Sequence, residues 1–484
     1  MCRSPEPPQS KPVRLPSFIS IAACSVAVLH AATSADVIAD WNKAARDHLA
    51  QNAPNLFQNW RGWVMLSVAE FDAVNAIVGG YTPYALNLAA PGASPEAAVA
   101  QAAYAVLTNI SRASLGSLDA ALTASLASVP DGPAKTDGIR VGQLAAEAVM
   151  RLRAADAPDL SVPAPPGSTA AGRWRPTPPS FGTAFGTQGR FLTPWTMRSA
   201  SQFRPGPPPP LSSEIYTRDY SEIRTLGSRG NTNRTPAQAD SARLREQGED
   251  YLDDVFARRP LPLLESTRRS ALCLMAGMDA LIQVFETKYT YNFWRPVTAI
   301  RAGASDGNDA TEGDLAWTPF LDTHPHPEYP SALVQNSAAM IEILILLHGD
   351  EVEFTATSTN PARSRSFRRL SHYVEDGITA RVVGGTHFRN SCEVAAEVGR
   401  QIARHAFENY LRPVPVLSPG APRQPAEFQL SLTTGRAVPF VVEASSDLVR
   451  WVPWRTNLYG TIRQTDTNAD AADRRFYRVL LPQP

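Results

Sequence analysis

Hydrophobic residues recur at helical spacing through most of the chain. Between residues 59 and 80 apolar side chains return every two to four positions, and Gly79-Gly80 ends the pattern. Ser94 is a typical N-cap, because a proline and a glutamate follow it in the first helical turn. Further helical runs cover 113–129, 138–155, 266–294, 331–349 and 391–411, with shorter helices expected from Glu214 and Pro236. The pattern predicts a mainly α protein whose residues 36–411 form an all-helical domain.

A proline-rich segment interrupts the helical pattern from residue 157 to 210. The stretches VPAPPG, RWRPTPPSFG and RPGPPPPL cannot form regular helix, because proline lacks the backbone N–H and disfavours helix in the residue before it. The segment also contains six large aromatic residues: Trp174, Phe181, Phe185, Phe191, Trp195 and Phe203. Aromatic side chains favour packing, so we expect this loop to lie over the helical body. A disordered linker is the alternative.

The composition changes twice beyond residue 411. Residues 412–426 are rich in proline and are predicted to be a linker. Short runs of β-branched and aromatic residues then alternate with turn signals in FQLSLTT, PFVVEASSD, GTIRQTD and RFYRVLLP. Residues 427–484 are therefore predicted to form a small antiparallel, β-sandwich-like module. It looks like the small C-terminal modules of some secreted bacterial proteins, and a role in attachment is a hypothesis.

The N-terminus has the pattern of an export signal. A basic stretch precedes an apolar run from residue 18 to 29, and small residues follow. Residues 1–31 are therefore predicted to be a signal peptide, which implies a secreted or periplasmic protein. Processing as a lipoprotein at Cys24 is the alternative.

The remaining composition excludes several classes of partner. The chain has 46 Lys and Arg against 46 Asp and Glu, so no global field attracts nucleic acid or an anionic membrane. No segment after the signal is predicted to span a membrane. The sequence contains neither a Walker motif nor a dinucleotide-binding glycine pattern. Cys273 and Cys392 remain after cleavage, either as free thiols or as a disulfide, and the oligomeric state stays open.

Five residues in three segments have the chemistry of an oxyanion pocket. Lys288 precedes Arg295 by seven residues in KYTYNFWRP, so on one helix the two would share a face, two turns apart. Ser331 in PEYPSAL begins a predicted helix, and Arg381 and His387 lie in ARVVGGTHFRN. Fixed cations, a hydroxyl and the N–H groups of a helix start bind phosphate-like ions. A histidine beside such an ion can coordinate it or attack it.

Each of these residues also has a structural interpretation. Lys288 and Arg295 lie among aromatic residues, which snorkelling or a cation–π contact would explain. Ser331 alone is most simply an N-cap. Arg381 alone is typical of the surface, and His387 alone fits a core histidine. The combination therefore carries the prediction, not any single member.

The combination resembles the vanadium-dependent haloperoxidases and the related type 2 phosphatidic acid phosphatases. KYTYNFWRPVTAIR, HPEYPS and ARVVGGTHFR carry the likeness, in this order along the chain. Upstream, DWNKAARDHL, FDAVNAI, GRWRPTPPSF and TPWTMRSASQFRPGPPP look like the secreted bacterial branch of the haloperoxidases. The likeness covers roughly residues 36–411 and implies an all-helical bundle.

The resemblance implies vanadate as cofactor, or a phosphoryl group in the same place. By match, Lys288, Arg295 and Arg381 would neutralise three equatorial oxygens. The Ser331 hydroxyl and the Ala332 N–H would add hydrogen bonds, with Ala332 in place of the usual glycine. One pocket serves both groups, because trigonal-bipyramidal vanadate resembles the transition state of phosphoryl transfer.

The resemblance makes His387 the residue bound to vanadium, or the nucleophile towards phosphorus. With the three cations it forms the predicted catalytic set. The family's Pro-Ser-Gly-His motif ends in an acid–base histidine, but Leu333 stands at that position here. Leucine cannot transfer a proton, so another group would have to. His324 and His326, shortly upstream, are the candidates.

The group that orients His387 also departs from the pattern. The family often has an acidic residue four positions after this histidine, and here that residue is Ser391. A serine can accept a hydrogen bond but stabilises an imidazolium less than a carboxylate does. Glu393 is the candidate substitute.

Three functions follow as hypotheses. The first is a haloperoxidase that oxidises halide with hydrogen peroxide, against which Leu333 argues. The second is an acid phosphatase that cleaves a phosphate ester through a phosphohistidine at His387. The third is a non-catalytic protein that binds an oxyanion and contacts a partner through residues 427–484. The sequence favours the haloperoxidase.

Overall fold

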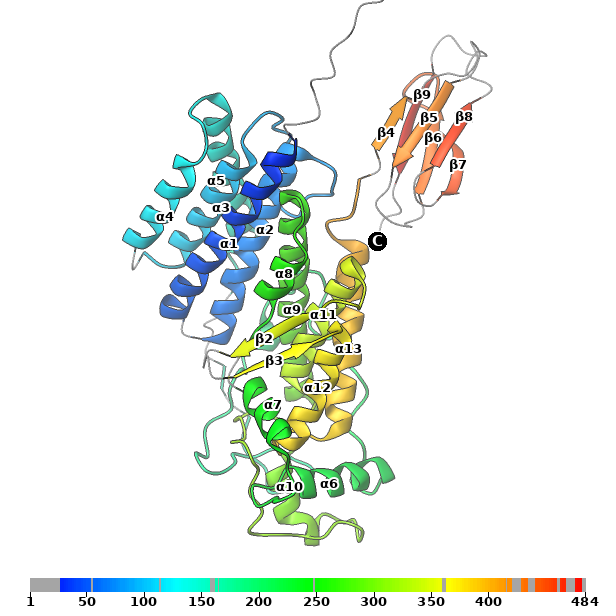
Figure 1. Ribbon diagram of the computed structural model, residues 1–484. Coiled ribbons are helices and arrows are strands. Elements are labelled where there is room, and N and C mark those ends of the chain that lie inside the picture. The colour runs from blue at the N-terminus through cyan, green and yellow to red at the C-terminus, as the bar shows by residue number, and fades with distance from the viewer. Residues whose placement is uncertain are drawn as a thin grey trace, which may run out of the picture.

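A helical body and a small β-module make up the structure (Figure 1). The computed structural model describes the chain from residue 27 to 480. Within that range it leaves out 54, 113–114, 157–161, 164, 247–248, 359–362, 415, 420–427, 434–439, 459–461 and 467–474. Most of the predicted signal peptide, including Cys24, lies outside the described residues.

The first helical bundle contains α1 to α5. Its helices are α1 (Ala27–Asn52), α2 (Leu56–Val78), α3 (Pro95–Ile110), α4 (Leu115–Ala127) and α5 (Pro133–Leu152). As predicted, Ser94 caps α3 through a hydrogen bond from the Ala97 N–H, and Gly79 ends α2. Alanine-rich α3 packs closely on α5, where a Cβ at Gly142 would lie 2.3 Å from the Ala98 carbonyl oxygen. Small residues therefore set the spacing of these two helices.

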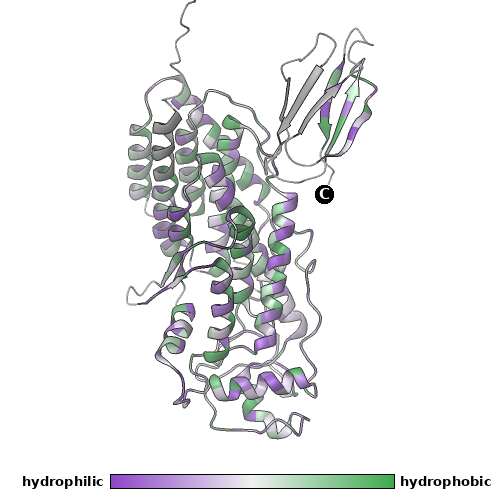
Figure 2. Ribbon diagram, turned by 45° about the vertical axis from the view of Figure 1, so that its right-hand side comes forward, coloured by the Kyte–Doolittle hydropathy of each residue, from purple (hydrophilic) through white to green (hydrophobic). Residues whose placement is uncertain are grey.

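The second bundle is built around α9 (Leu263–Tyr291), which packs on α2 and so joins the two bundles. Around it lie α6 (Glu214–Leu226), α7 (Pro236–Glu246), α8 (Leu252–Arg258), α10 (Pro296–Ala302), α11 (Ala332–His348), α12 (Leu370–Val383) and α13 (Arg389–Asn409). Hydrophobic and hydrophilic residues are interspersed along the helices of the body (Figure 2). Helix α9 is long and apolar enough to cross a membrane, but 94% of its most apolar window is buried inside the protein. Such burial is typical of the core helix of a bundle.

Three short strands accompany the second bundle. Strands β1 (Glu249–Asp250), β2 (Phe354–Ser358) and β3 (Ser364–Phe367) form an antiparallel sheet in the order β1-β2-β3. The sequence analysis predicted helices alone for this domain, so the sheet is an addition. It is short because β3 has four residues and β1 has two.

The predicted continuous helix from Lys288 to Arg295 was wrong. Helix α9 ends at Tyr291, because Asn292 takes the left-handed conformation with φ 50°. Arg295 instead occupies the N-cap position of α10 without a side-chain capping hydrogen bond, and Pro296 lies in the first turn. The chain turns between the two cations, so tertiary structure rather than helical periodicity brings them together.

The proline-rich loop packs on the body, as predicted. Trp174 and Trp195 are buried, and the backbone N–H of Trp174 donates to the Asn292 carbonyl oxygen at 2.9 Å. Asp279 on α9 accepts the backbone N–H groups of Trp195, Thr196 and Met197. Other aromatics of the loop, Phe181, Phe185 and Phe191, are exposed. The loop includes a turn of 3-10 helix at Gly189–Phe191.

The C-terminal module consists of antiparallel strands, as predicted. One sheet has the order β4-β5-β8 and the other β7-β6-β9. Their bounds are β4 (Val416–Pro419), β5 (Phe428–Thr433), β6 (Phe440–Ser445), β7 (Val452–Leu458), β8 (Ile462–Asp466) and β9 (Phe476–Leu480). Strand β4 lies inside the predicted linker 412–426 and pairs with β5, so that segment is not linker throughout. Strand β7 was not predicted either.

The two cysteines of the body are free thiols. Cys273 lies on α9 and Cys392 on α13, and both are buried. Of the two alternatives left by the sequence, the structure therefore has the unpaired one.

Candidate functional site

The five predicted site residues converge at one end of the second bundle. Lys288 comes from the last turn of α9, Arg295 precedes α10, and Ser331 precedes α11. Arg381 comes from the last turn of α12, and His387 lies between α12 and α13. All five side chains are buried, with at most 2% of each residue exposed. Burial of three cations around one histidine is uncommon without a functional reason.

The Lys288 ammonium holds the segment that leads to α11. It donates to the carbonyl oxygens of Pro327 and Glu328, both at 2.9 Å, and to that of Pro330. Three acceptors match the three N–H bonds of an ammonium, so this geometry favours the charged form. Burial and the nearby Arg295 act in the opposite direction and lower the pKa of Lys288 well below its usual value. Lys288 thus positions residues 327–330 and brings positive charge to the site.

Arg295 links two histidines. Its Nε donates to the His326 carbonyl oxygen at 2.8 Å, and Nη1 donates to the Thr386 carbonyl oxygen at 2.9 Å. Nη1 also lies 3.1 Å from His387 Nε2, and Nη2 lies 3.0 Å from His326 Nδ1. Burial lowers the pKa of Arg295 to about 10, so the guanidinium stays charged at neutral pH.

His387 is oriented by Glu328, a residue that the sequence analysis did not single out. His387 Nδ1 lies 3.0 Å from Glu328 Oε1, which also accepts the Phe388 N–H at 2.9 Å. An arginine can only donate, so His387 Nε2 must accept from Arg295, and the ring proton lies on Nδ1 facing Glu328. Burial and the surrounding cations lower the pKa of His387 well below its usual value, which keeps the ring neutral. The geometry thus leaves the lone pair on Nε2.

The sequence-based candidate for orienting His387, Glu393, was wrong, because its side chain is exposed. Ser391 does contribute, but indirectly: its hydroxyl donates to Glu328 Oε2 at 2.6 Å. Burial raises the pKa of Glu328 to about 7, while Ser391 and Lys288 counteract the rise. Three donors around one carboxylate favour its ionised form.

Arg381 is held by an acidic partner from a distant helix. Its Nη1 donates to Glu246 Oε2 at 2.6 Å, and Glu246 Oε1 lies 2.9 Å from His324 Nε2. Burial would raise the pKa of Glu246, but Arg381 and His324 hold it at about 2. Three cations therefore face two carboxylates, Glu328 and Glu246, and the site has an excess of one positive charge when both are ionised.

Two buried donors at the site lack an acceptor among the described residues. They are the Ser331 hydroxyl and the Nε–H of Arg381. The Ser331 hydroxyl counteracts the effect of burial on the pKa of the Cys392 thiol, but the two groups do not meet hydrogen-bond geometry. A buried donor without a partner costs about 1–3 kcal/mol. A tetrahedral oxyanion would supply acceptor oxygens for both, so the residues present fit vanadate or phosphate.

The start of α11 adds to this fit. Ser331 is in the N-cap position, as predicted, but its side chain makes no capping hydrogen bond. The hydroxyl therefore stays available for another partner. Ala332 begins the 17-residue helix, whose N-terminus carries partial positive charge.

His326 is the upstream histidine that contacts a site residue, Arg295, whereas Leu333 has no titratable group. His326 is buried, and its ring packs edge-on against Phe285 at 5.4 Å between centroids. Its Nδ1 lies within hydrogen-bond distance of Arg295 Nη2 and of the Pro327 carbonyl oxygen, and the two contacts require opposite tautomers. Burial and then Arg295 lower the pKa of His326 well below its usual value. His324 stacks on His326 but is half exposed and pairs with Glu246.

Two functional neighbours were missed by sequence reasoning. Glu328 lies inside PEYPS, where a carboxylate three residues before Ser331 was a usable signal. The sequence contained no signal for Glu246, because this residue lies 135 residues from Arg381 along the chain. Only the packing of α7 on α12 brings that pair together.

Comparisons with known proteins agree with this picture. Residues 269–415, which contain all five predicted site residues, match the family model of the VCPO second helical-bundle domain. No curated protein sequence matches the chain significantly.

Several solved structures share the fold. The first bacterial vanadium-dependent iodoperoxidase superposes with a TM-score of 0.64 at 20% identity, over 77% of this chain and 95% of that one. An apo bacterial vanadium-dependent chloroperoxidase gives 0.57 at 18% identity, over 72% and 92% of the two chains. The holo form gives 0.56 at 18% identity, over 73% and 91%. The helical body of this chain therefore has the vanadium haloperoxidase fold, and residues 269–415 correspond to the second helical bundle of that family.

Proposed function

We propose that this chain is a secreted, vanadate-dependent haloperoxidase that oxidises halide with hydrogen peroxide. One observation carries the proposal: a buried, neutral His387 has its Nδ1 proton held by Glu328 and its Nε2 lone pair among buried cations. A histidine that bonds to an oxyanion's central atom needs this tautomer. The fold of solved bacterial haloperoxidases supports the same assignment.

The same residues that the resemblance selected would hold vanadate. Lys288, Arg295 and Arg381 would balance its charge, the Ser331 hydroxyl and Ala332 N–H would donate to its oxygens, and His387 Nε2 would bind it. When bound, vanadate supplies a Lewis-acidic centre that activates hydrogen peroxide towards halide. Arg295 would exchange its contact with His387 Nε2 for a contact to an oxyanion oxygen, since one lone pair cannot serve both.

His326 replaces the missing acid–base histidine in this proposal. Its imidazole lies 3.0 Å from Arg295 Nη2, so it borders the predicted oxyanion position from the side of Arg295. The cations that lower its pKa would be offset by an anion in the pocket, which brings the ring closer to the pKa of a useful proton carrier. Leu333 is instead a partly buried residue that packs against the hydrophobic core.

A non-catalytic oxyanion-binding protein is the second candidate, and a specific observation favours it. All three donors of Lys288 are directed to backbone carbonyl oxygens, so this residue contributes charge and position but no spare hydrogen bond. Together with Leu333, this arrangement would suit binding without turnover. An acid phosphatase would use the same His387 Nε2 as a nucleophile.

The deciding experiment titrates the purified protein with vanadate by calorimetry and assays the same sample for bromide oxidation by hydrogen peroxide. We expect 1:1 binding that is lost in His387→Ala, together with vanadate-dependent turnover. Binding without turnover at any pH would reject the haloperoxidase and favour the non-catalytic protein. Hydrolysis of an aryl phosphate that vanadate inhibits would instead identify the phosphatase.

A second experiment tests His326. In His326→Gln we expect vanadate affinity to stay within about threefold, since binding changes below about 1 kcal/mol are of this size. Bromide turnover should fall by about 10²-fold, the lower range for general acid–base catalysis. His372→Gln is the matched control, because His372 is exposed on α12. Equal turnover in the two variants would remove His326 from the mechanism.

A further inference from the structure

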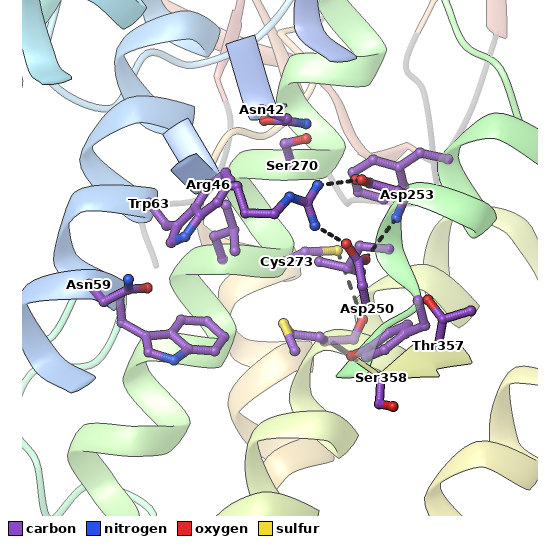
Figure 3. Close-up of a pocket in the computed structure, with 16 residues that line it drawn as sticks. Asn42, Arg46, Asn59, Trp63, Asp250, Asp253, Ser270, Cys273, Thr357 and Ser358 are labelled. Atoms are coloured by element: carbon purple, nitrogen blue, oxygen red, sulfur yellow. Dashed lines mark hydrogen bonds and ion pairs between the residues drawn. The ribbon is translucent and has the colours of Figure 1, made fainter. Parts of the chain in front are cut away.

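A cavity lies between the two helical bundles, away from the oxyanion site. It has a volume of about 550 Å³ and is bordered by α1, α2, α8, α9 and α11 (Figure 3). Cys273 on α9 lines it, whereas Lys288 on the same helix belongs to the oxyanion site. The two residues are 15 positions apart, which is about 22 Å along a helix axis. None of the five predicted oxyanion-site residues borders this cavity.

The walls of the cavity are mainly apolar and aromatic. Trp60 and Trp63 come from α2, Phe256 from α8, Leu274 from α9 and Met340 from α11. Trp60, Trp63 and Leu274 are only partly buried although they adjoin the core, which indicates that the cavity exposes their faces. Cavities of 300–1,000 Å³ with apolar walls and a few polar groups are typical of small-molecule sites.

A buried hydroxyl on the cavity wall has no partner. Ser270 on α9 is 5% exposed, and its Oγ makes no hydrogen bond with any described residue. A helical serine usually satisfies its hydroxyl on a backbone carbonyl of the preceding turn. Because Ser270 lines the cavity, a ligand with a hydrogen-bonding group would satisfy it (Figure 3).

The charges on the cavity wall disfavour anions. Arg46 on α1 forms ion pairs with both Asp250 and Asp253 (Figure 3). One cation against two carboxylates leaves this wall with one net negative charge. The faces of Trp60 and Trp63 are likewise compatible with a neutral or positively charged ring system, because the face of an indole is electron-rich.

We propose that this cavity binds a small aromatic molecule whose polar group is uncharged or positively charged. The aromatic part lies against Trp60 and Trp63, and the polar group meets the Ser270 hydroxyl. This site is independent of the oxyanion site and of the proposed peroxidase function, since no residue belongs to both.

A pair of probes that differ in one group tests the proposal. N-phenyl-1-naphthylamine is neutral, and 1-anilinonaphthalene-8-sulfonate has the same rings with a sulfonate added. We expect saturable 1:1 binding of the neutral probe by the full chain, seen as a rise in its fluorescence. The sulfonate should bind at least about tenfold more weakly, a difference of about 1.4 kcal/mol. Asp253→Asn removes one negative charge at a half-exposed position and should reduce the difference in affinity between the two probes.

Filling the cavity is the complementary test. Leu274→Trp should weaken binding of the neutral probe by at least about tenfold, and Val78→Trp, which adds the same ring at an exposed position on α2, should leave it unchanged. Ser270→Ala gives a second variant that keeps the packing and should also weaken binding. The proposal is overturned by absence of saturable binding, by equal affinity for the two probes, or by equal losses in Leu274→Trp and Val78→Trp.

Discussion

Glu328 Oε1 accepts a hydrogen bond from the Nδ1–H of His387 at 3.0 Å, inside a site where both side chains are almost fully buried. The carboxylate is supplied by the segment before α11 rather than by the helix that follows the histidine. Lys288 holds that segment through three backbone carbonyl oxygens. Lys288 and His387 are therefore connected through the backbone of this segment and Glu328, in addition to their electrostatic interaction.

Glu328→Gln should impair oxyanion binding without unfolding the protein. The amide keeps the shape but removes the charge that holds the His387 proton, and loss of such a supporting contact typically costs about 10–100-fold in affinity. Calorimetry with vanadate measures this loss, and the ring-nitrogen NMR signals of His387 should report a changed tautomer. Glu393→Gln is the control, because that carboxylate is exposed and should leave both readouts unchanged.

Leu333→His should increase turnover. The substitution restores an imidazole in the first turn of α11, at the position where the resembling family has its acid–base histidine. We expect a gain on the order of 10²-fold in bromide oxidation at unchanged vanadate affinity. Leu347→His places the same residue near the other end of α11 and should give no gain. A Leu333→His protein that binds vanadate but gains nothing would mean that the missing proton carrier does not limit the site.

Asp279→Ala should detach the proline-rich loop from α9. The buried carboxylate accepts the N–H groups of Trp195, Thr196 and Met197 and the Thr196 hydroxyl, and alanine would leave these donors unsatisfied. We expect the free energy of unfolding to drop by about 3 kcal/mol or more. Urea denaturation measures the change. Asp47→Ala, which removes an exposed carboxylate paired with Lys43, should cost less than about 1 kcal/mol.

Glu70 should make stability depend on pH. Burial raises the pKa of Glu70 from about 4.5 to about 8, and its Oε1 has no partner among the described residues. The folded state then binds more protons than the unfolded state between pH 4.5 and 8. The contribution of Glu70 to stability therefore falls as pH rises through this window, by up to about 1.4 kcal/mol per unit, and is constant above it.

Glu70→Gln isolates this contribution, since glutamine does not titrate. The stability of the variant relative to the wild type should increase from pH 5 to pH 8.5 in matched urea denaturations. A constant difference between the two proteins across that range would contradict the assignment.

The sequence by itself determined most of the helices and some of their ends, and it predicted the chemistry of the site. Helical periodicity, the cap at Ser94 and the glycine at 79 are local features, and local backbone preferences enforce them. The combination of Lys288, Arg295, Ser331, Arg381 and His387 pointed to an oxyanion site, because fixed cations, a hydroxyl and the N–H groups of a helix start bind phosphate-like ions.

The tertiary structure alone decided which residues pair with one another at the site. Periodicity put Lys288 and Arg295 on one helix, but the left-handed Asn292 breaks it, and the two cations meet through packing. The pairs Glu328–His387 and Glu246–Arg381 join segments 59 and 135 residues apart. A pairing of this kind depends on which helices pack together, and no local pattern in the chain encodes it. The cavity beside Ser270 is likewise a product of packing between bundles.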